Sequence, residues 1–340
     1  MNSIYDKTIS QLEEFFVGLG EKKFRAVQVF EWLYLKRINC FSEMTNVKKD
    51  VLDVIKNNFL IDKLSLEDVE RSSDSNKYLF KLSDGNRVES VLMRHDYGNS
   101  ICISSQVGCN MGCKFCESGR LKKVRNLTAG EMVLQIMMVE EDIKEKINSV
   151  VVMGIGEPFD NFSNIVDFIS IINHPKGLGI GSRHITISTS GIVPKIREFA
   201  ELEYQVNLAI SLHAPNDELR SRLMPINKAY PIDRLMSEVK KYVAKTNRKV
   251  TIEYIMLKDV NDLEKYALEL CNLVKGLNCV VNLIPYNETS HLEFKRSKKD
   301  TILKFYDIMK KNKVNVTIRK EFGKEISAAC GQLRSNKEDL

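Results

Sequence analysis

The chain has 340 residues, of which 43% are hydrophobic and 28% are charged, with 7 prolines and 17 glycines. This composition is typical of a folded globular protein and excludes a collagenous, low-complexity or disordered chain. The 51 basic and 45 acidic side chains give a formal net charge of +6, a modest excess that suits a nucleic-acid partner without requiring one.

The N-terminus has no basic stretch followed by an apolar core, and no window approaches the roughly 18 apolar residues of a membrane span. We therefore expect a cytoplasmic protein with no membrane association. Eight cysteines in such a chain are better explained by metal or redox chemistry than by a framework of disulfides.

Helical periodicity dominates the first part of the chain, in "ISQLEEFFVGLG", "FRAVQVFEWLYLKR" and "NVKKDVLDVIKNNF". Apolar residues recur there at helical spacing, and Gly18 and Gly20 give a stop signal. We predict a helical accessory module over residues 1–60. The next segment, "KYLFKLSDGNRVESVLMR", has two β-rich runs around Asp84-Gly85, which predicts a β-hairpin extension within residues 61–95.

Strands and helices alternate over the remaining residues, 96–340, which form the predicted core. This alternation favours an α/β fold with a parallel sheet or a partial barrel. A capping box at Thr128–Glu131 marks the start of one helix. The expected strands are "SICISS", "NSVVVMG", "HITIST", "QVNLAISL", "KVTIEYIML", "CVVNLIPY" and "VNVTIR".

Three cysteines, Cys109, Cys113 and Cys116, have C-x3-C-x2-C spacing in the loop after the first of these strands. Loops at the carboxyl ends of strands build the active sites of βα barrels, so the position favours a function. Three buried structural cysteines are one interpretation, and a zinc site with a distant fourth ligand is another. An iron–sulfur cluster is the third, because a four-iron cluster held by three cysteines keeps one iron open for a substrate or cofactor.

The triplet resembles the signature of radical S-adenosylmethionine (SAM) enzymes, and "VVVMGIGEP" resembles the motif that holds the SAM amino group in that superfamily. The resemblance implies a partial (β/α)6 barrel of TIM type, one [4Fe-4S] cluster on Cys109, Cys113 and Cys116, and SAM on the open iron. Its cleavage would give a 5′-deoxyadenosyl radical.

The resemblance narrows further to the dual-specificity adenine C2-methyltransferases of 23S ribosomal RNA and transfer RNA. It is carried by "ICISSQVGCNMGCKFC", "RNLTAGE", "HITISTSGIVP", "ISLHAPN", "LMPINKAYP", "NLIPYN" and "ISAACGQLR", with "FRAVQVFEWLY" and "FSEMTNV" matching the helical extension of that family. The resemblance implies methylation of an adenosine in the peptidyl-transferase loop and of the adenosine 3′ to the anticodon, with two SAM molecules used per turnover.

In this family one SAM methylates a cysteine, and the radical from a second SAM converts that methyl group into a methylene that adds to the base. The resemblance assigns the methyl-carrying role to Cys330, the resolving role to Cys102 and the general base to Glu89. Positions that match SAM contacts of the family are Gly156, Glu157, Ser188, Ser211, Leu212, His213 and Asn287.

The same resemblance implies an electron donor of flavodoxin or ferredoxin type and a monomeric enzyme. We expect RNA contacts from the helical module, from "GRLKKVRN" and from "EFKRSKK". Two alternatives stay open: the related antibiotic-resistance enzymes that methylate C8 of the ribosomal adenosine, and a zinc-dependent RNA-binding protein without catalysis. Glu117 departs from the family pattern, and a carboxylate there is expected to lower the reduction potential of the cluster.

Overall fold

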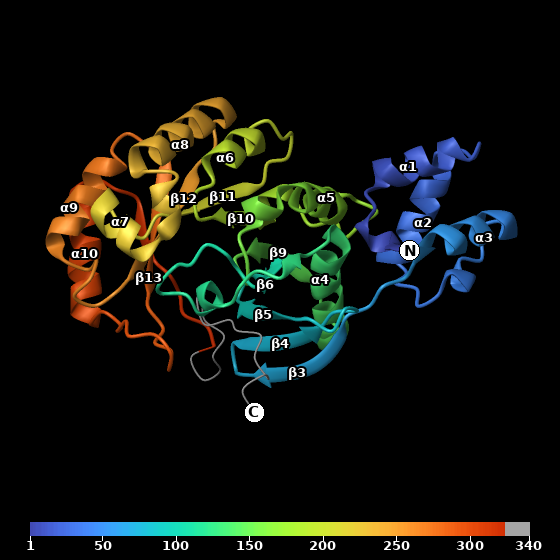
Figure 1. Cartoon of the computed structure of the whole chain (residues 1–340), viewed down its shortest axis with the longest axis horizontal. Coiled ribbons are helices and arrows are strands. Elements are labelled where there is room, and N and C mark those ends of the chain that lie inside the picture. The colour runs from blue at the N-terminus through green and yellow to red at the C-terminus, as the bar shows by residue number, and fades with distance from the viewer. Residues whose placement is uncertain (324–340) are drawn as a thin grey trace.

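The computed structural model describes residues 1–323, and a ten-stranded mixed sheet forms the centre of this part of the chain (Figure 1). Seven neighbouring strands run parallel in the order β14-β13-β12-β11-β10-β9-β6, and the antiparallel strands β5, β4 and β3 continue the sheet beyond β6. The parallel strands are β6 (Gly98–Ile103), β9 (Ile147–Val152), β10 (Ile185–Thr189), β11 (Asn207–Ser211), β12 (Val250–Met256), β13 (Cys279–Pro285) and β14 (Val316–Ile318).

The two edge strands, β14 and β3, do not pair with each other, so the described sheet is an open, partial barrel as predicted. Parallel neighbours need crossover connections, and helices supply most of them. These are α4 (Ala129–Ile143), α5 (Phe162–Asn173), α6 (Val193–Phe199), α7 (Asp217–Leu223), α8 (Ile232–Thr246), α9 (Glu264–Leu273) and α10 (Lys299–Lys311). Figure 1 shows α5, α6, α8, α9 and α10 around the outside of the curved sheet.

The predicted capping box begins α4: the Thr128 hydroxyl accepts from the Glu131 N–H at 3.2 Å, and the Glu131 carboxylate accepts from the Thr128 N–H at 2.9 Å. The predicted hairpin also forms. Strands β4 (Ser75–Lys81) and β5 (Arg87–His95) pair antiparallel, and β3 (Ser65–Arg71) pairs with β4. Since β5 pairs in turn with β6, the hairpin belongs to the same sheet as the parallel strands.

The N-terminal module contains α1 (Ile9–Gly18), α2 (Phe24–Tyr34) and α3 (Lys49–Asn58), with β1 (Asn2–Ser3) pairing with β2 (Phe59–Leu60). Figure 1 shows these helices together at one end of the molecule, next to α4 and α5. Apolar side chains of the module and of the sheet form one continuous buried core.

Polar contacts fix this attachment. The Gly130 N–H at the start of α4 donates to Asp6 Oδ1 at 3.0 Å, and the Gln11 amide donates to Asp167 of α5 at 3.2 Å. The division into residues 1–60, 61–95 and 96–340 remains a prediction.

Replacing Gly130 with alanine is expected to weaken this attachment. The added Cβ would lie 2.7 Å from Asp6 Oδ1 and 2.8 Å from the Tyr5 carbonyl carbon. We expect Gly130→Ala to lower the free energy of unfolding by about 1–3 kcal/mol in urea titrations. The control is Gly18→Ala, whose Cβ meets no atom within 4 Å and which should keep or raise stability. Equal stability of the two variants would contradict this packing.

Candidate active site

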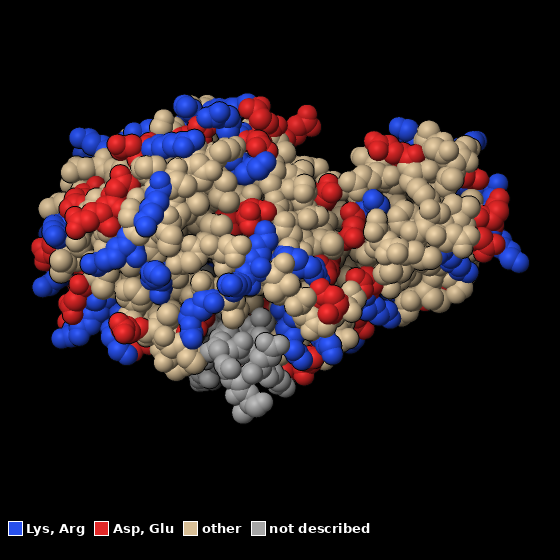
Figure 2. Space-filling view, in the orientation of Figure 1, with Lys and Arg blue, Asp and Glu red and all other residues tan. Residues whose placement is uncertain are grey.

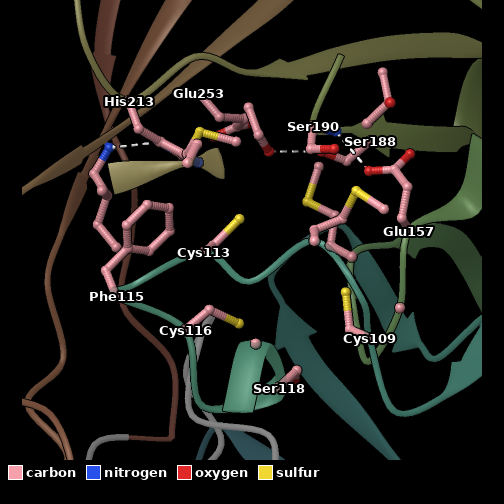
Figure 3. A pocket seen from close by; sticks show the side chains of 18 of the residues that line it. Cys109, Cys113, Phe115, Cys116, Ser118, Glu157, Ser188, Ser190, His213 and Glu253 are labelled. Carbon is pink, nitrogen blue, oxygen red and sulfur yellow. Dashed lines mark hydrogen bonds between the residues drawn. The ribbon is translucent and has the colours of Figure 1, made fainter. Parts of the chain in front are cut away.

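A cavity lies at the carboxyl ends of the parallel strands (Figure 3). There the loop of residues 108–124, which carries the three cysteines and is called the cysteine loop below, meets residues from β9 to β13. The carboxyl ends of parallel strands share one edge of a sheet, so side chains distant in sequence meet there. The cavity brings together the three cysteines of the triplet and five of the seven residues that match SAM contacts, namely Gly156, Glu157, Ser188, Ser211 and His213.

The thiols of Cys109, Cys113 and Cys116 point into the same space (Figure 3). Their loop follows the short strand β7 (Gln106–Val107), which pairs with β8 (Arg125–Asn126) and so holds the two ends of the loop together. Gly108 turns the chain with φ +72°, and a Cβ at this position would lie 2.1 Å from the Lys122 carbonyl oxygen. The loop therefore requires glycine directly before its first cysteine.

Three cysteine thiolates are a donor set that suits an iron–sulfur cluster, in which each thiolate binds a separate iron. Burial raises the pKa of Cys109 to about 12. Burial, followed by the charges of Cys116 and Cys109, also raises the pKa of Cys113 well above its usual range. Three thiolates at this place need a compensating positive charge, which iron ions would supply.

Glu157 is buried, and both of its carboxylate oxygens accept backbone hydrogen bonds. Phe159 N donates to Oε1 at 3.0 Å and Ser190 N donates to Oε2 at 2.7 Å. Burial raises the pKa of Glu157, while these hydrogen bonds oppose that shift. The carboxylate therefore joins the end of β9 to the end of β10 and still lines the cavity.

Serine hydroxyls form a polar patch on the cavity wall. The Oγ atoms of Ser188 and Ser211, on neighbouring strands β10 and β11, lie 3.5 Å apart. Ser190 also lines the cavity, and its buried hydroxyl lies next to the Glu157 carboxylate. Together these hydroxyls offer hydrogen-bond donors and acceptors to a polar ligand such as SAM.

His213 is a buried, neutral imidazole between the cysteine loop and β12. Burial, with the Arg220 charge as the smaller cause, lowers its pKa to about 3. Its Nδ1 accepts from Ile255 N at 3.1 Å, so the ring proton is on Nε2, and the ring packs edge-on against Phe115 at 4.8 Å. His213 has φ +59°, a strained value for a residue with a side chain.

Two residues that match SAM contacts do not line this cavity. Leu212 is fully buried in the core, and its backbone N–H donates to the Glu253 carbonyl oxygen at 3.1 Å. Asn287 is half-buried and follows the end of β13.

Three charged residues near the cavity were missing from the sequence prediction. Glu253 on β12 lines the cavity and accepts from Asn282 at 3.0 Å, and burial raises its pKa against the opposing charge of Arg319. Arg319, directly after β14, also lines the cavity. Arg220 is fully buried and donates to the carbonyls of Ser190 and Leu212, at 2.6 and 3.2 Å. Only Glu253 had a signal, since a charged residue is unusual within an apolar parallel strand.

Glu89 and Cys102 lie on the same face of the sheet, on β5 and β6. Cys102 is opposite Val91 in the register, so Glu89, two residues away, is its diagonal neighbour. Both are buried, and the Lys77 ammonium lies 3.9 Å from Glu89 Oε1. Cys102 packs in an apolar cluster that Met153, a residue of the cavity wall, also contacts.

Cys330 lies outside the described residues, which end with Gly323. The chain reaches this point beside Cys102, because Phe322 belongs to the same apolar cluster. The Phe322 ring contacts His95 at 4.6 Å, and the Gly323 N–H donates to Asp74 Oδ1 at 3.1 Å.

Glu117, directly after Cys116, is buried. Its Oε2 accepts from Arg120 at 3.1 Å, while Oε1 has no hydrogen-bond partner within the described chain. The Arg120 cation therefore offsets part of the charge next to the cysteine loop.

Comparisons with known proteins agree with this geometry. The model of the radical SAM superfamily matches residues 103–271, and that of the ribosomal RNA large subunit methyltransferase N-terminal domain matches residues 2–61. A radical SAM methyltransferase from Sphaerobacter thermophilus has the same fold, with a TM-score of 0.92 and 39% identity over 99% of this chain and 100% of that one.

The fold and the site thus define a radical SAM methyltransferase, a class whose members use a [4Fe-4S] cluster and SAM. Curated relatives narrow the class. The probable dual-specificity RNA methyltransferase RlmN of Enterococcus faecalis is 55% identical and covers 98% of this chain and 96% of that protein. The protein of the same name from Acholeplasma laidlawii is 53% identical and covers 98% of both chains. The chain belongs to the RlmN family of RNA methyltransferases. No helix of the described residues is long and apolar enough to cross a membrane.

Replacing Cys113 with serine should prevent assembly of the cluster, because serine does not supply the thiolate ligand. After anaerobic reconstitution we expect the variant to lose most of its bound iron and its broad absorbance near 400 nm. The control is Cys40→Ser, since Cys40 is exposed and lies in the N-terminal module. Similar iron contents in the two variants would contradict a cluster at the triplet.

Proposed function

We propose that the chain methylates C2 of an adenosine in the peptidyl-transferase loop of 23S ribosomal RNA and of the adenosine 3′ to the anticodon in transfer RNA. The proposal is supported by the names of the relatives, which describe dual-specificity RNA methyltransferases. The observation that carries the proposed route through protein cysteines is the placement of Glu89 and Cys102 as diagonal neighbours beside the cysteine-lined cavity.

Methylation at C2 of adenine needs a radical route, because this carbon is not nucleophilic and cannot attack the methyl group of SAM. When bound, the cluster and SAM supply a 5′-deoxyadenosyl radical. In our proposal Gly156, Glu157, Ser188, Ser211 and His213 hold SAM in the cavity, together with Leu212 and Asn287 at its periphery.

The Cys330 thiolate would first take the methyl group of one SAM, which forms a sulfur–carbon bond and releases S-adenosylhomocysteine. This S-methyl group then gives a hydrogen atom to the 5′-deoxyadenosyl radical, which becomes 5′-deoxyadenosine, and a methylene radical remains on Cys330. The radical adds to C2 of the adenine, so RNA and protein become covalently joined. One turnover therefore uses two SAM molecules.

Glu89 and Cys102 would then release the product. After the base radical has passed one electron to the oxidised form of the flavodoxin- or ferredoxin-type carrier, the Glu89 carboxylate takes the proton from C2. The Cys102 thiolate attacks the Cys330 sulfur, forms a disulfide and breaks the bond between that sulfur and the methylene carbon. This carbon takes up a proton and becomes the new methyl group.

Chain length allows this pairing. Cys330 is the seventh residue after Gly323, and a fully extended chain over seven residues spans at most about 25 Å. Phe322, next to Gly323, already packs in the same cluster as Cys102. The length of this segment therefore permits the proposed pairing of Cys330 with Cys102.

The proposal includes a reductant of flavodoxin or ferredoxin type and a monomeric enzyme. A target adenine has to leave its stack to meet Cys330, which costs a few kcal/mol and favours loop nucleotides. Both proposed targets lie in loops.

Methylation at C8 is the second candidate, because the related resistance enzymes share the triplet and the positions of Cys330, Cys102 and Glu89. Nucleoside mass spectrometry separates the two products. After reaction with SAM and a reductant, we expect 2-methyladenosine in both a 23S ribosomal RNA fragment and a transfer RNA. Only 8-methyladenosine, or methylation of a single RNA class, would contradict the proposal.

Replacing Cys102 and replacing Cys330 should stop the reaction at different steps. We expect Cys102→Ala to accumulate a covalent protein–RNA adduct on denaturing gels, because no thiol remains to break the Cys330–methylene bond. Cys330→Ala should form neither adduct nor methylated RNA while keeping its iron. Cys279→Ala, a control at another buried cysteine, should turn over normally. Free, methylated RNA released at the normal rate by Cys102→Ala would contradict its resolving role.

A further inference from the structure

A basic groove lies outside the cavity. The cysteine loop and α7 form one wall of this groove, and the loops that follow β12 and β13 form the other wall. The cationic side chains of the groove are Lys114, Arg222, Lys258 and Lys295. Lys114 sits between Cys113 and Phe115, which both line the cavity. The groove therefore begins one residue away from the cavity wall, although the two share no lining residue.

Backbone hydrogen bonds fix both walls of the groove. Lys114 N donates to the Leu223 carbonyl oxygen at 2.9 Å, which ties the cysteine loop to α7. On the other wall, Lys258 N donates to the Lys295 carbonyl oxygen at 2.8 Å. The cationic side chains therefore project from a backbone that is already arranged for binding.

Positive charge exceeds negative charge in the groove, where four cations face the carboxylates of Asp259 and Glu293. Lys295 forms a 3.0 Å ion pair with Glu288, and Lys258 lies 3.9 Å from Asp259. Within the described part of the chain neither Lys114 nor Arg222 has an ion-pair partner. Figure 2 shows Lys and Arg side chains below the position of α7, near the cysteine loop.

The groove also presents an aromatic surface. Phe294 is half-buried among the cationic residues and packs edge-on against Tyr286 with ring centroids 6.4 Å apart. Tyr286 lies in the apolar cluster that contacts Cys113 and Cys116. A partly exposed ring held in this way offers a stacking surface between cations.

We propose that the basic groove binds the phosphodiester backbone of the RNA strand that leads to the cavity. Lys114 and Arg222 contact phosphates from one wall, Lys258 and Lys295 from the other, and Phe294 stacks on a base. A nucleotide strand presents phosphates and flat bases in alternation, which matches cations around an aromatic ring. The inference rests on the proposed function, since it concerns how the same RNA reaches the same site.

An acidic electron-transfer protein is the competing partner, because the groove is also close to the cysteine loop. The partly exposed Phe294 ring in a concave surface favours RNA, since bases stack on aromatic side chains. If the groove binds RNA, its variants lose RNA affinity. If it binds an electron-transfer protein, they lose the rate of cluster reduction, so one set of variants tests both partners.

The test measures affinity for a fluorescent anticodon stem-loop by anisotropy over a range of salt concentrations. We expect Lys258→Glu with Lys295→Glu to bind about tenfold or more weakly, and the slope of log K against log salt to fall by about one to two. Lys114→Glu with Arg222→Glu should behave similarly. The control pair, Lys304→Glu with Lys311→Glu, makes the same charge change on exposed positions of α10.

Iron content and urea midpoints equal to those of the control pair establish that the Lys258 and Lys295 variant is folded and loaded. RNA affinity equal to that of the control pair would overturn the inference. Slower reduction of the cluster by a flavodoxin, with RNA affinity unchanged, would also overturn it and assign the groove to the reductant. Nucleoside analysis of the unmodified chain reports separately on the proposed function, because RNA affinity does not depend on which carbon is methylated.

Discussion

Three half-buried thiols in one loop are the constraint on which the rest of the site depends. Their conversion to thiolates is unfavourable without a strong positive charge, as the raised pKa values of Cys109 and Cys113 show. The surrounding residues fix the loop so that the three thiols face the cavity. Gly108 turns the loop, β7 and β8 close its base, and Arg120 offsets the charge of Glu117.

The neighbouring strands β5 and β6 carry Glu89 and Cys102, the residues proposed to release the methylated RNA from the enzyme. The antiparallel strand β5 places Glu89 on the same face as Cys102, and Cys102 lies close to the cavity through Met153. The hairpin is therefore more than an extension of the sheet, because it carries the proposed base. The chain then returns to this place at Phe322, eight residues before the proposed methyl carrier.

Local patterns predicted most of the fold. Apolar β-rich runs gave all seven parallel strands, and the Thr128–Glu131 capping box began α4 where expected. The triplet and the Gly-Glu-Pro turn were visible because each is contiguous in sequence. The sequence could not show that both Glu157 carboxylate oxygens accept hydrogen bonds from backbone N–H groups, because one of these belongs to Ser190, which follows another strand.

Residues that depend on packing were missed for the same reason. Arg220 lies on a short helix with charged neighbours, and nothing in that pattern indicates a fully buried guanidinium bound to carbonyls at two strand ends. The basic groove likewise joins Lys114, Arg222, Lys258 and Lys295 from four separate segments. Of these four residues, only Lys295 lay in a segment predicted to contact RNA, "EFKRSKK". A run of charges alone does not distinguish a binding surface from a solvated one.

Isotope transfer from SAM to RNA through the protein tests the central claim most directly. The enzyme is first methylated with SAM that carries a trideuterated methyl group, freed of excess SAM, and then given unlabelled SAM, reductant and RNA. The route through Cys330 predicts 2-methyladenosine with two deuterium atoms in its methyl group, because one is removed to form the methylene radical. An unlabelled methyl group, or one that keeps all three deuterium atoms, would contradict it.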